Sequence, residues 1–155
     1  MTRPLHFAGL IIASLGSWEA YHLWRQLIGV LGWLDTGLRD WSYPILSVLL
    51  IASAIVPLPL DRSTRYRAAI ICLLAVAAYF LAIYLIFFLT WTPADATEIW
   101  GVQGRYFLVA LAPMAVAIAA LVNRGPRVIV QSAIATGSAV VSIAATTEAI
   151  LRVNW

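Results

Sequence analysis

The stretch 68–89 contains no charged side chain and is long enough to cross the hydrocarbon core of a membrane as one helix. Four further stretches are nearly as apolar. The five predicted spans are residues 5–23, 43–60, 68–89, 106–122 and 128–151. Hydrophobic residues make up 63% of the chain and charged residues 11%, whereas soluble domains have roughly 45–50% and 25%. The sequence therefore predicts an all-α integral membrane protein with a single transmembrane domain over residues 1–155.

Basic side chains are unequally shared between the two sides that these spans would create. All ten are arginines. The side with the N-terminus and the loops 61–67 and 123–127 carries six of them and one acid, and the other side carries four with six acids. Because cytoplasmic loops are enriched in basic residues, we expect a cytoplasmic N-terminus and a C-terminus outside. The net charge of +3 is too modest to indicate a nucleic-acid partner.

The predicted outer side is also marked by its aromatic residues and by an unusual loop. All seven tryptophans fall on or near that side. Indole rings favour the headgroup region, so the outer surface is predicted to lie in the membrane interface or to cover a neighbouring protein. The loop 25–42 mixes apolar residues with glycines and is too short to span. Such a segment is predicted to be interfacial or re-entrant.

Two loop motifs support a more specific interpretation. They are GVLGWLDT at 29–36 and WTPADATEIWGVQGRYF at 91–107. In this order and spacing they resemble the C-terminal part of a bacterial integral membrane family catalogued as domain of unknown function 2142. That family is similar to polytopic glycosyltransferases that use polyprenyl-phosphate sugars at an outer site. The resemblance implies a multi-pass protein of the bacterial inner membrane, with the lipid bilayer and a polyprenyl-phosphate lipid as partners.

The chain departs from the family pattern in two ways. Typical members have many more spans, and the related transferases carry an acidic catalytic base in an early outer loop that has no counterpart in this chain. The family also tends to have a proline soon after GRYF, where this chain has Val109 and only later Pro113. The resemblance therefore implies part of the family's fold more directly than it implies the family's activity.

Candidate substrate-binding residues lie in the second motif. Arg105 can hold a phosphate or a carboxylate with two parallel hydrogen bonds, and Gln103 and Trp100 are close to it in sequence. In a transferase, Arg105 would bind a lipid-linked pyrophosphate. The alternative is a structural arginine that pairs with Asp95 or Glu98, because a charge near the membrane needs a partner whatever its function.

Three outer acids are candidate catalytic residues: Asp35, Asp95 and Glu98. Each could act as a base or help to bind a divalent cation. No metal-ligand spacing surrounds them, so no metal site is predicted, and capping or salt bridges are the alternative role. Asp35 precedes Thr36 and Gly37 and so is typical of a turn.

Glu19 and His22 lie three residues apart and would share one face of a helix. They could relay a proton, or His22 alone could ligate a pigment. The alternative is a polar cluster at the membrane interface, and no cofactor is predicted. Glu148 is expected to pair with Arg152, four residues later in the last span.

The last predicted span is rich in small residues. Ser132, Ala133, Gly137 and Ser142 recur at helical spacings, and such residues allow two helices to approach closely. They could pack within the chain or against another membrane subunit. Two functions remain open: a non-catalytic accessory or structural subunit of a larger inner-membrane complex, or a glycosyltransferase-like protein that handles polyprenyl-phosphate-linked sugars.

Overall fold

The computed structural model describes residues 4–16, 18–31, 36–55, 60–122 and 128–154. These residues are almost entirely helical, which confirms the predicted all-α class. In chain order the elements are α1 (Pro4–Gly16), α2 (Trp18–Gly29), β1 (Val30–Leu31), β2 (Thr36–Gly37), α3 (Ser42–Ala54), α4 (Arg62–Thr90), the single 3-10 turn η1 (Gly104–Phe107), α5 (Leu108–Val122) and α6 (Val128–Asn154). The two short strands pair antiparallel, with Val30 opposite Gly37 and Leu31 opposite Thr36.

Three helices of the described part are long and apolar enough to cross a membrane. They are Arg62–Thr90, Gly104–Val122 (η1 with α5) and Ile129–Arg152. They correspond to three of the five predicted spans, and each is a continuous helical segment. The structure thus agrees with a multi-pass membrane protein whose helices contact the lipid bilayer.

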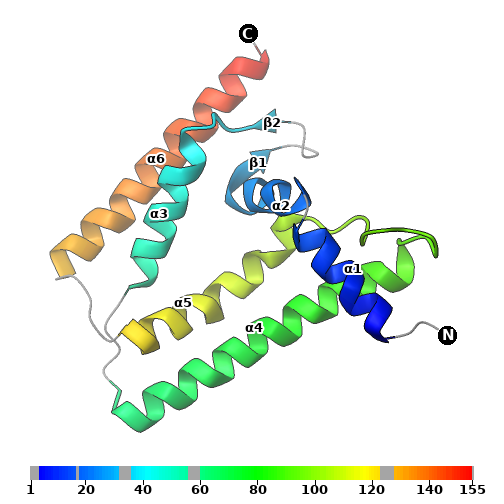
Figure 1. Cartoon of the computed structure of the whole chain (residues 1–155). Coiled ribbons are helices and arrows are strands. Elements are labelled where there is room, and N and C mark those ends of the chain that lie inside the picture. The colour runs from blue at the N-terminus through cyan, green and yellow to red at the C-terminus, as the bar shows by residue number, and fades with distance from the viewer. Residues whose placement is uncertain (1–3, 17, 32–35, 56–59, 123–127, 155) are drawn as a thin grey trace.

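The predicted span 5–23 is wrong as one continuous helix. Its residues fall on α1 and α2, which run in different directions (Figure 1). The change of direction follows Gly16, a poor helix former. Glu19 lies in the first turn of α2, where the positive end of the helix dipole favours a carboxylate. Hydropathy alone detects neither the break after Gly16 nor the start of a new helix near Glu19, because it is averaged over residues on both sides of the junction.

The predicted span 43–60 is a shorter helix in the structure. The 13 residues of α3 extend only about 20 Å, less than the roughly 30 Å of a hydrocarbon core. Residues 56–59 of this predicted span lie outside the described residues.

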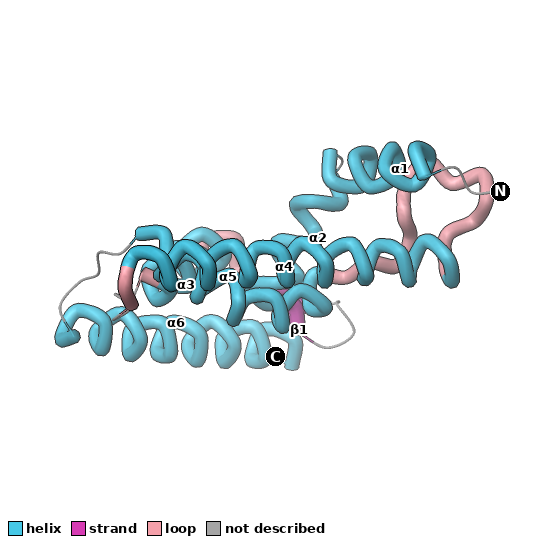
Figure 2. The backbone as a smooth tube through the Cα atoms, turned by 90° about the horizontal axis from the view of Figure 1, so that it is seen from below, coloured by secondary structure: helices cyan, strands magenta, loops and turns pink. Residues whose placement is uncertain are grey.

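The helices are arranged around α4 and α5, which pack side by side (Figure 1). Helix α3 packs beside α6, and α2 packs on η1. Figure 2 shows α1 displaced to one side of the other helices, over one end of α4. There, Phe7 lies 5.1 Å from Phe88 between ring centroids, and His6 lies 6.5 Å from the same ring. The beginning of α1 is therefore at the same end of α4 as the 91–103 loop and at the opposite end from Arg62. This placement contradicts the predicted crossing by residues 5–23, on which the expected cytoplasmic N-terminus depended.

Two apolar clusters form the core of the described residues. Leu10, Tyr84 and Ile99 join α1, α4 and the 91–103 loop. Leu38, Tyr43, Ala145 and Ala149 join the segment after β2 to α3 and α6.

The start of α4 is capped by Asp61. Its carboxylate accepts a hydrogen bond from the Thr64 backbone N–H at 3.0 Å, which satisfies one donor of the first turn. Hydrogen bonds from Thr64 lower the pKa of Asp61, because they stabilise the charged carboxylate. This cap fixes where the longest helix begins, directly before a cluster of arginines at 62, 65 and 67.

Candidate functional site

The loop between α4 and η1 folds back over the C-terminal end of α4. The backbone N–H groups of Trp91 and Thr92 both donate to the Phe87 carbonyl, at 3.0 and 3.1 Å. The Thr92 hydroxyl donates to the same carbonyl and accepts from the Trp100 N–H at 3.2 Å. Gly101 has φ +84°, and a Cβ at that position would lie 3.1 Å from the Phe87 ring. The second half of the loop is therefore fixed close to the helix end.

Ser14 connects α1 to the same loop. Its hydroxyl donates to the Leu10 carbonyl and accepts from the Ile99 N–H, both at 2.9 Å. Ser14 and Ile99 are buried, and Ile99 packs with Leu10 against Tyr84. One side chain of α1 thus satisfies a backbone donor of a loop 85 residues later.

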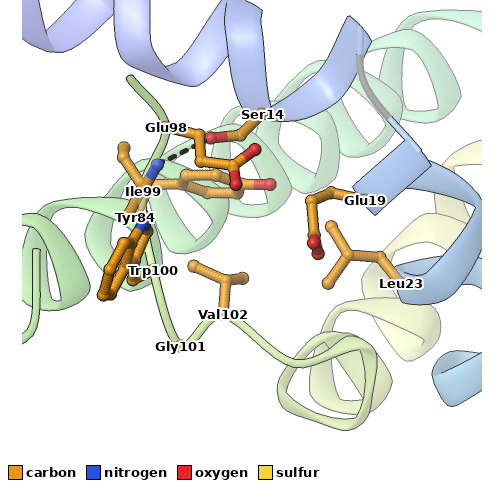
Figure 3. A pocket seen from close by; sticks show the side chains of 9 residues that line it. All are labelled: Ser14, Glu19, Leu23, Tyr84, Glu98, Ile99, Trp100, Gly101 and Val102. Atoms are coloured by element: carbon orange, nitrogen blue, oxygen red, sulfur yellow. Dashed lines mark hydrogen bonds between the residues drawn. The ribbon is translucent and has the colours of Figure 1, made fainter. Parts of the chain in front are cut away.

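These contacts border a half-open cavity of about 320 Å³ between α1, α2, α4 and residues 98–102 (Figure 3). Its lining residues are Ser14, Glu19, Leu23, Tyr84, Glu98, Ile99, Trp100, Gly101 and Val102. Figure 3 shows the carboxyl groups of Glu98 and Glu19 approaching the cavity from different elements, with the Tyr84 hydroxyl between them. None of the described residues that line this cavity, called here the acidic cavity, is basic.

The Tyr84 hydroxyl is the exceptional group in this cavity. The side chain is 0% exposed, and the hydroxyl has no hydrogen-bond partner among the described residues. Buried polar groups are nearly always hydrogen-bonded, so such a group requires an explanation. The oxygen lies at the wall of the cavity, between the carboxyl groups of Glu19 and Glu98 (Figure 3).

Gly104 positions η1 by close backbone packing. Its N–H donates to the Gln26 Oε1 at 2.7 Å. A Cβ at Gly104 would lie 2.0 Å from the Leu23 carbonyl oxygen and 2.7 Å from the Leu27 nitrogen. Only glycine therefore lets η1 approach α2 this closely. The Tyr79 hydroxyl also holds η1, by donating to the Tyr106 carbonyl at 2.8 Å.

The structure brings only part of the second motif together. Glu98 and Trp100 line the acidic cavity, while Asp95 is exposed and does not. Gln103 has a buried Oε1 without a partner among the described residues, away from the cavity lining. Arg105 is exposed, with its guanidinium carbon 5.8 Å from the Tyr106 ring centroid. The expected ion pair of Arg105 with Asp95 or Glu98 is not formed within the described part of the chain.

The structure describes some, but not all, of the predicted residues outside that motif. Asp35 lies outside the described residues. His22 lies on α2 with its ring 6.0 Å from that of Tyr21. Glu19, predicted to cluster with His22, lines the acidic cavity. The sequence did not predict that Glu19 and Glu98 line the same cavity, because no local spacing links residues on different elements.

A second polar cavity, of about 470 Å³, lies beside the hairpin of β1 and β2. Its described lining residues are Arg25, Gly37, Leu38, Arg39, Asp40, Trp41 and Arg152. Each of its three arginines has a partner: Arg25 pairs with Asp40 at 3.1 Å, Arg39 with Glu148, and Arg152 donates to the Gly37 carbonyl at 2.6 Å. The expected Glu148–Arg152 pair is therefore wrong. These long-range contacts tie the hairpin to α6, and no sequence spacing predicts them.

The electrostatics of Arg25 follow from its neighbours. A hydrogen bond with Tyr43 raises the pKa of Arg25 above its usual value, and the negative charge of Asp40 adds to this shift. Burial opposes this shift but does not reverse it. Its guanidinium carbon lies 4.4 Å from the Tyr43 ring centroid, in cation–π contact. Arg25 therefore remains charged and connects α2 to Asp40, in the segment after β2.

The small residues predicted for helix packing in α6 are mostly open. Ser132, Ala133 and Ser142 are exposed. A Cβ at Gly137 would meet no atom within 4 Å. The contact of α6 with α3 includes the buried Ala145 and Ala149 near its C-terminal end, and Ser142 lines a cavity together with Leu46, Leu50 and Ser53 of α3.

The family model described as "Predicted membrane protein (DUF2142)" matches residues 2–115. The match contains both loop motifs and every lining residue of the acidic cavity. No curated protein and no solved structure matches the chain.

Proposed function

The chain belongs to the predicted membrane protein family DUF2142, and on this premise we propose that it is a non-catalytic accessory subunit of a larger assembly in the bacterial inner membrane. The proposal is supported above all by the open face of α6. Ser132 and Ala133 are exposed, and Gly137 has empty space where a side chain would be. Small residues of this kind let a second helix approach closely, which packing of large aliphatic side chains prevents.

The way α6 is held in the chain is consistent with this role. Its C-terminal part is fixed to α3 and the hairpin through Ala145, Glu148, Ala149 and Arg152. The small-residue face lies in the preceding turns, which these contacts leave open. A partner helix could therefore dock on α6 without disturbing the core of this chain.

The distribution of charge suggests an orientation. The end of α4 that carries Arg62, Arg65 and Arg67 would face the cytoplasm, and the 91–103 loop and the hairpin would face outside. Helices α4, α5 and α6 would cross the membrane, with the shorter α3 beside α6 as a further crossing element and the C-terminus outside. Helices α1 and α2 would lie at the outer face.

This orientation predicts a labelling pattern in intact cells. In a Cys72→Ser background, a cysteine introduced at Thr97 in the outer loop should react with a membrane-impermeant maleimide. A cysteine at Ser63, at the other end of α4, should react only after the membrane is opened. Both positions are exposed in the structure, so accessibility within the protein is matched. The reverse pattern would refute the orientation.

The accessory role is tested by substituting Gly137. Gly137→Leu should abolish recovery of stoichiometric partners in mild detergent, because the larger side chain would keep the partner helix away. The thermal unfolding temperature of the purified chain should be nearly unchanged, since a Cβ at Gly137 would meet no neighbouring atom of the described chain within 4 Å. The matched control is Ala77→Leu on the exposed face of α4, which should leave recovery intact. A stable wild-type monomer without partners, or full recovery with Gly137→Leu, would refute the role.

A second function is favoured by one observation, the meeting of Glu19, Glu98 and Trp100 in one cavity. A glycosyltransferase-like protein could use such carboxylates on a polyprenyl-phosphate-linked sugar. Sugar transfer by the purified chain alone, lost on Glu98→Gln and weakened by Arg105→Ala, would favour this function over the accessory role.

A further inference from the structure

We propose that the acidic cavity binds an ammonium group, carried either by a small soluble amine or by the headgroup of a zwitterionic lipid. The proposal concerns the cavity between α1, α2, α4 and residues 98–102, and it does not depend on the accessory role assigned to α6. Figure 3 shows the groups that carry it.

The first argument is the unpartnered hydroxyl of Tyr84. The side chain is 0% exposed, and its oxygen lacks a hydrogen-bond partner among the described residues. A buried hydroxyl in this state is energetically costly, and a bound donor would remove the cost. A phenolic oxygen can accept a hydrogen bond from an ammonium N–H.

The second argument is the sign of the charge. Glu19 and Glu98 reach the cavity from α2 and from the loop, and no described lining residue is basic. A cation would therefore be attracted, and a ligand that carries only negative charge, such as inorganic phosphate, would be repelled. An ammonium group has three N–H donors, which suits two carboxylates and one hydroxyl oxygen.

The third argument concerns the rim and the size. Trp100 lines the cavity and is 53% exposed, so its ring is accessible for cation–π contact with an incoming ammonium group. A volume of about 320 Å³ is at the lower end of the range for small-molecule sites. A bare divalent cation fits less well, because calcium takes six to eight oxygen ligands. No group of three or more metal-binding side chains occurs in the described part of the chain.

The experiment measures ligand-dependent thermal unfolding and affinity of the full-length protein purified in mild detergent. Glucosamine and glucose form a matched pair of probes that differ in one amino group. Glucosamine and ethanolamine are expected to raise the unfolding temperature, and glucose is not. The effect should weaken as salt concentration rises, since it depends on charge. In nanodiscs, phosphatidylethanolamine mixed with phosphatidylglycerol is compared with phosphatidylglycerol alone to test the lipid source.

Variants then locate the site. Glu98→Gln should weaken amine affinity by about tenfold, because it removes one charge-assisted hydrogen bond. Tyr84→Phe should weaken it by a few-fold while leaving the ligand-free unfolding temperature unchanged or slightly higher, since the lost hydroxyl has no partner. Asp95→Asn is the control, in the same loop but outside the cavity lining, and should bind like the wild type.

The outcomes separate clearly. Binding of soluble amines, or stabilisation by phosphatidylethanolamine alone, supports the proposal and identifies the source of the ammonium group. Equal binding of glucose and glucosamine, stabilisation by calcium or magnesium alone, or no stabilisation by any amine would overturn it. An unfolding temperature that falls strongly in ligand-free Tyr84→Phe would assign the hydroxyl to structure and would also overturn it.

Discussion

Gly104→Ala is expected to be the most damaging single-methyl substitution in the described part of the chain. The added carbon would lie 2.0 Å from the Leu23 carbonyl oxygen and 2.7 Å from the Leu27 nitrogen. Both atoms belong to the backbone of α2, so no side-chain rotation relieves the clash. Overpacking of this kind costs about 1–3 kcal/mol and more where backbone must move, so we expect at least about 3 kcal/mol.

The loss of stability in Gly104→Ala should be larger than the cost of the clash alone. Moving η1 away from α2 would also break the hydrogen bond from the Gly104 N–H to Gln26 and would widen the acidic cavity, since Glu19 and Leu23 belong to α2. Thermal unfolding in detergent measures the effect. Gly137→Ala is the matched control, because its methyl group meets no atom within 4 Å. Similar unfolding temperatures for the two variants would contradict the close approach of η1 to α2.

Tyr43→Phe is expected to produce the second largest loss of folding stability. The Tyr43 hydroxyl accepts from the Leu38 N–H at 3.0 Å and donates to the Gly29 carbonyl at 3.1 Å. Its side chain is almost fully buried. Removing the oxygen leaves the Leu38 N–H and the Gly29 carbonyl without this hydrogen-bond partner. Each unpaired group lowers the free energy of unfolding by about 1–3 kcal/mol if it remains buried.

A second tyrosine supplies the control for this prediction. Tyr84 is equally buried, but its hydroxyl has no partner among the described residues. Tyr84→Phe should therefore leave the unfolding temperature nearly unchanged where Tyr43→Phe lowers it by several degrees. Equal effects of the two variants would show that the hydrogen bonds of Tyr43 do not stabilise the hairpin.

The three long helices could be predicted because hydropathy alone determines them. Helix α4, η1 with α5, and helix α6 each contain an apolar stretch whose length matches a membrane, and this signal needs no tertiary information. The first predicted span was wrong because its structure depends on information that hydropathy lacks. The junction after Gly16 and the packing of Phe7 on Phe88 are local and tertiary effects that an averaged hydropathy does not contain.

The sequence predicted some residues of the candidate site but not which residues lie together in it. Glu98 and Trp100 stand out because they are polar or amphipathic residues in a long loop between apolar stretches. Their meeting with Glu19 could not be predicted, because it depends on how α2 is turned relative to α4. The same applies to the Arg39–Glu148 pair, whose partners are on different elements. Arg105 was singled out for its chemistry, but the structure leaves it exposed.

The hydrogen bond between Ser14 and Ile99 has a consequence for how the protein is made. Its two partners are 85 residues apart, and at typical synthesis rates the second is added roughly 4–17 s after the first. During that interval α1 has been made but the surface it covers has not. Helix α1 therefore reaches its final position only after α4 and the loop that follows it have been made.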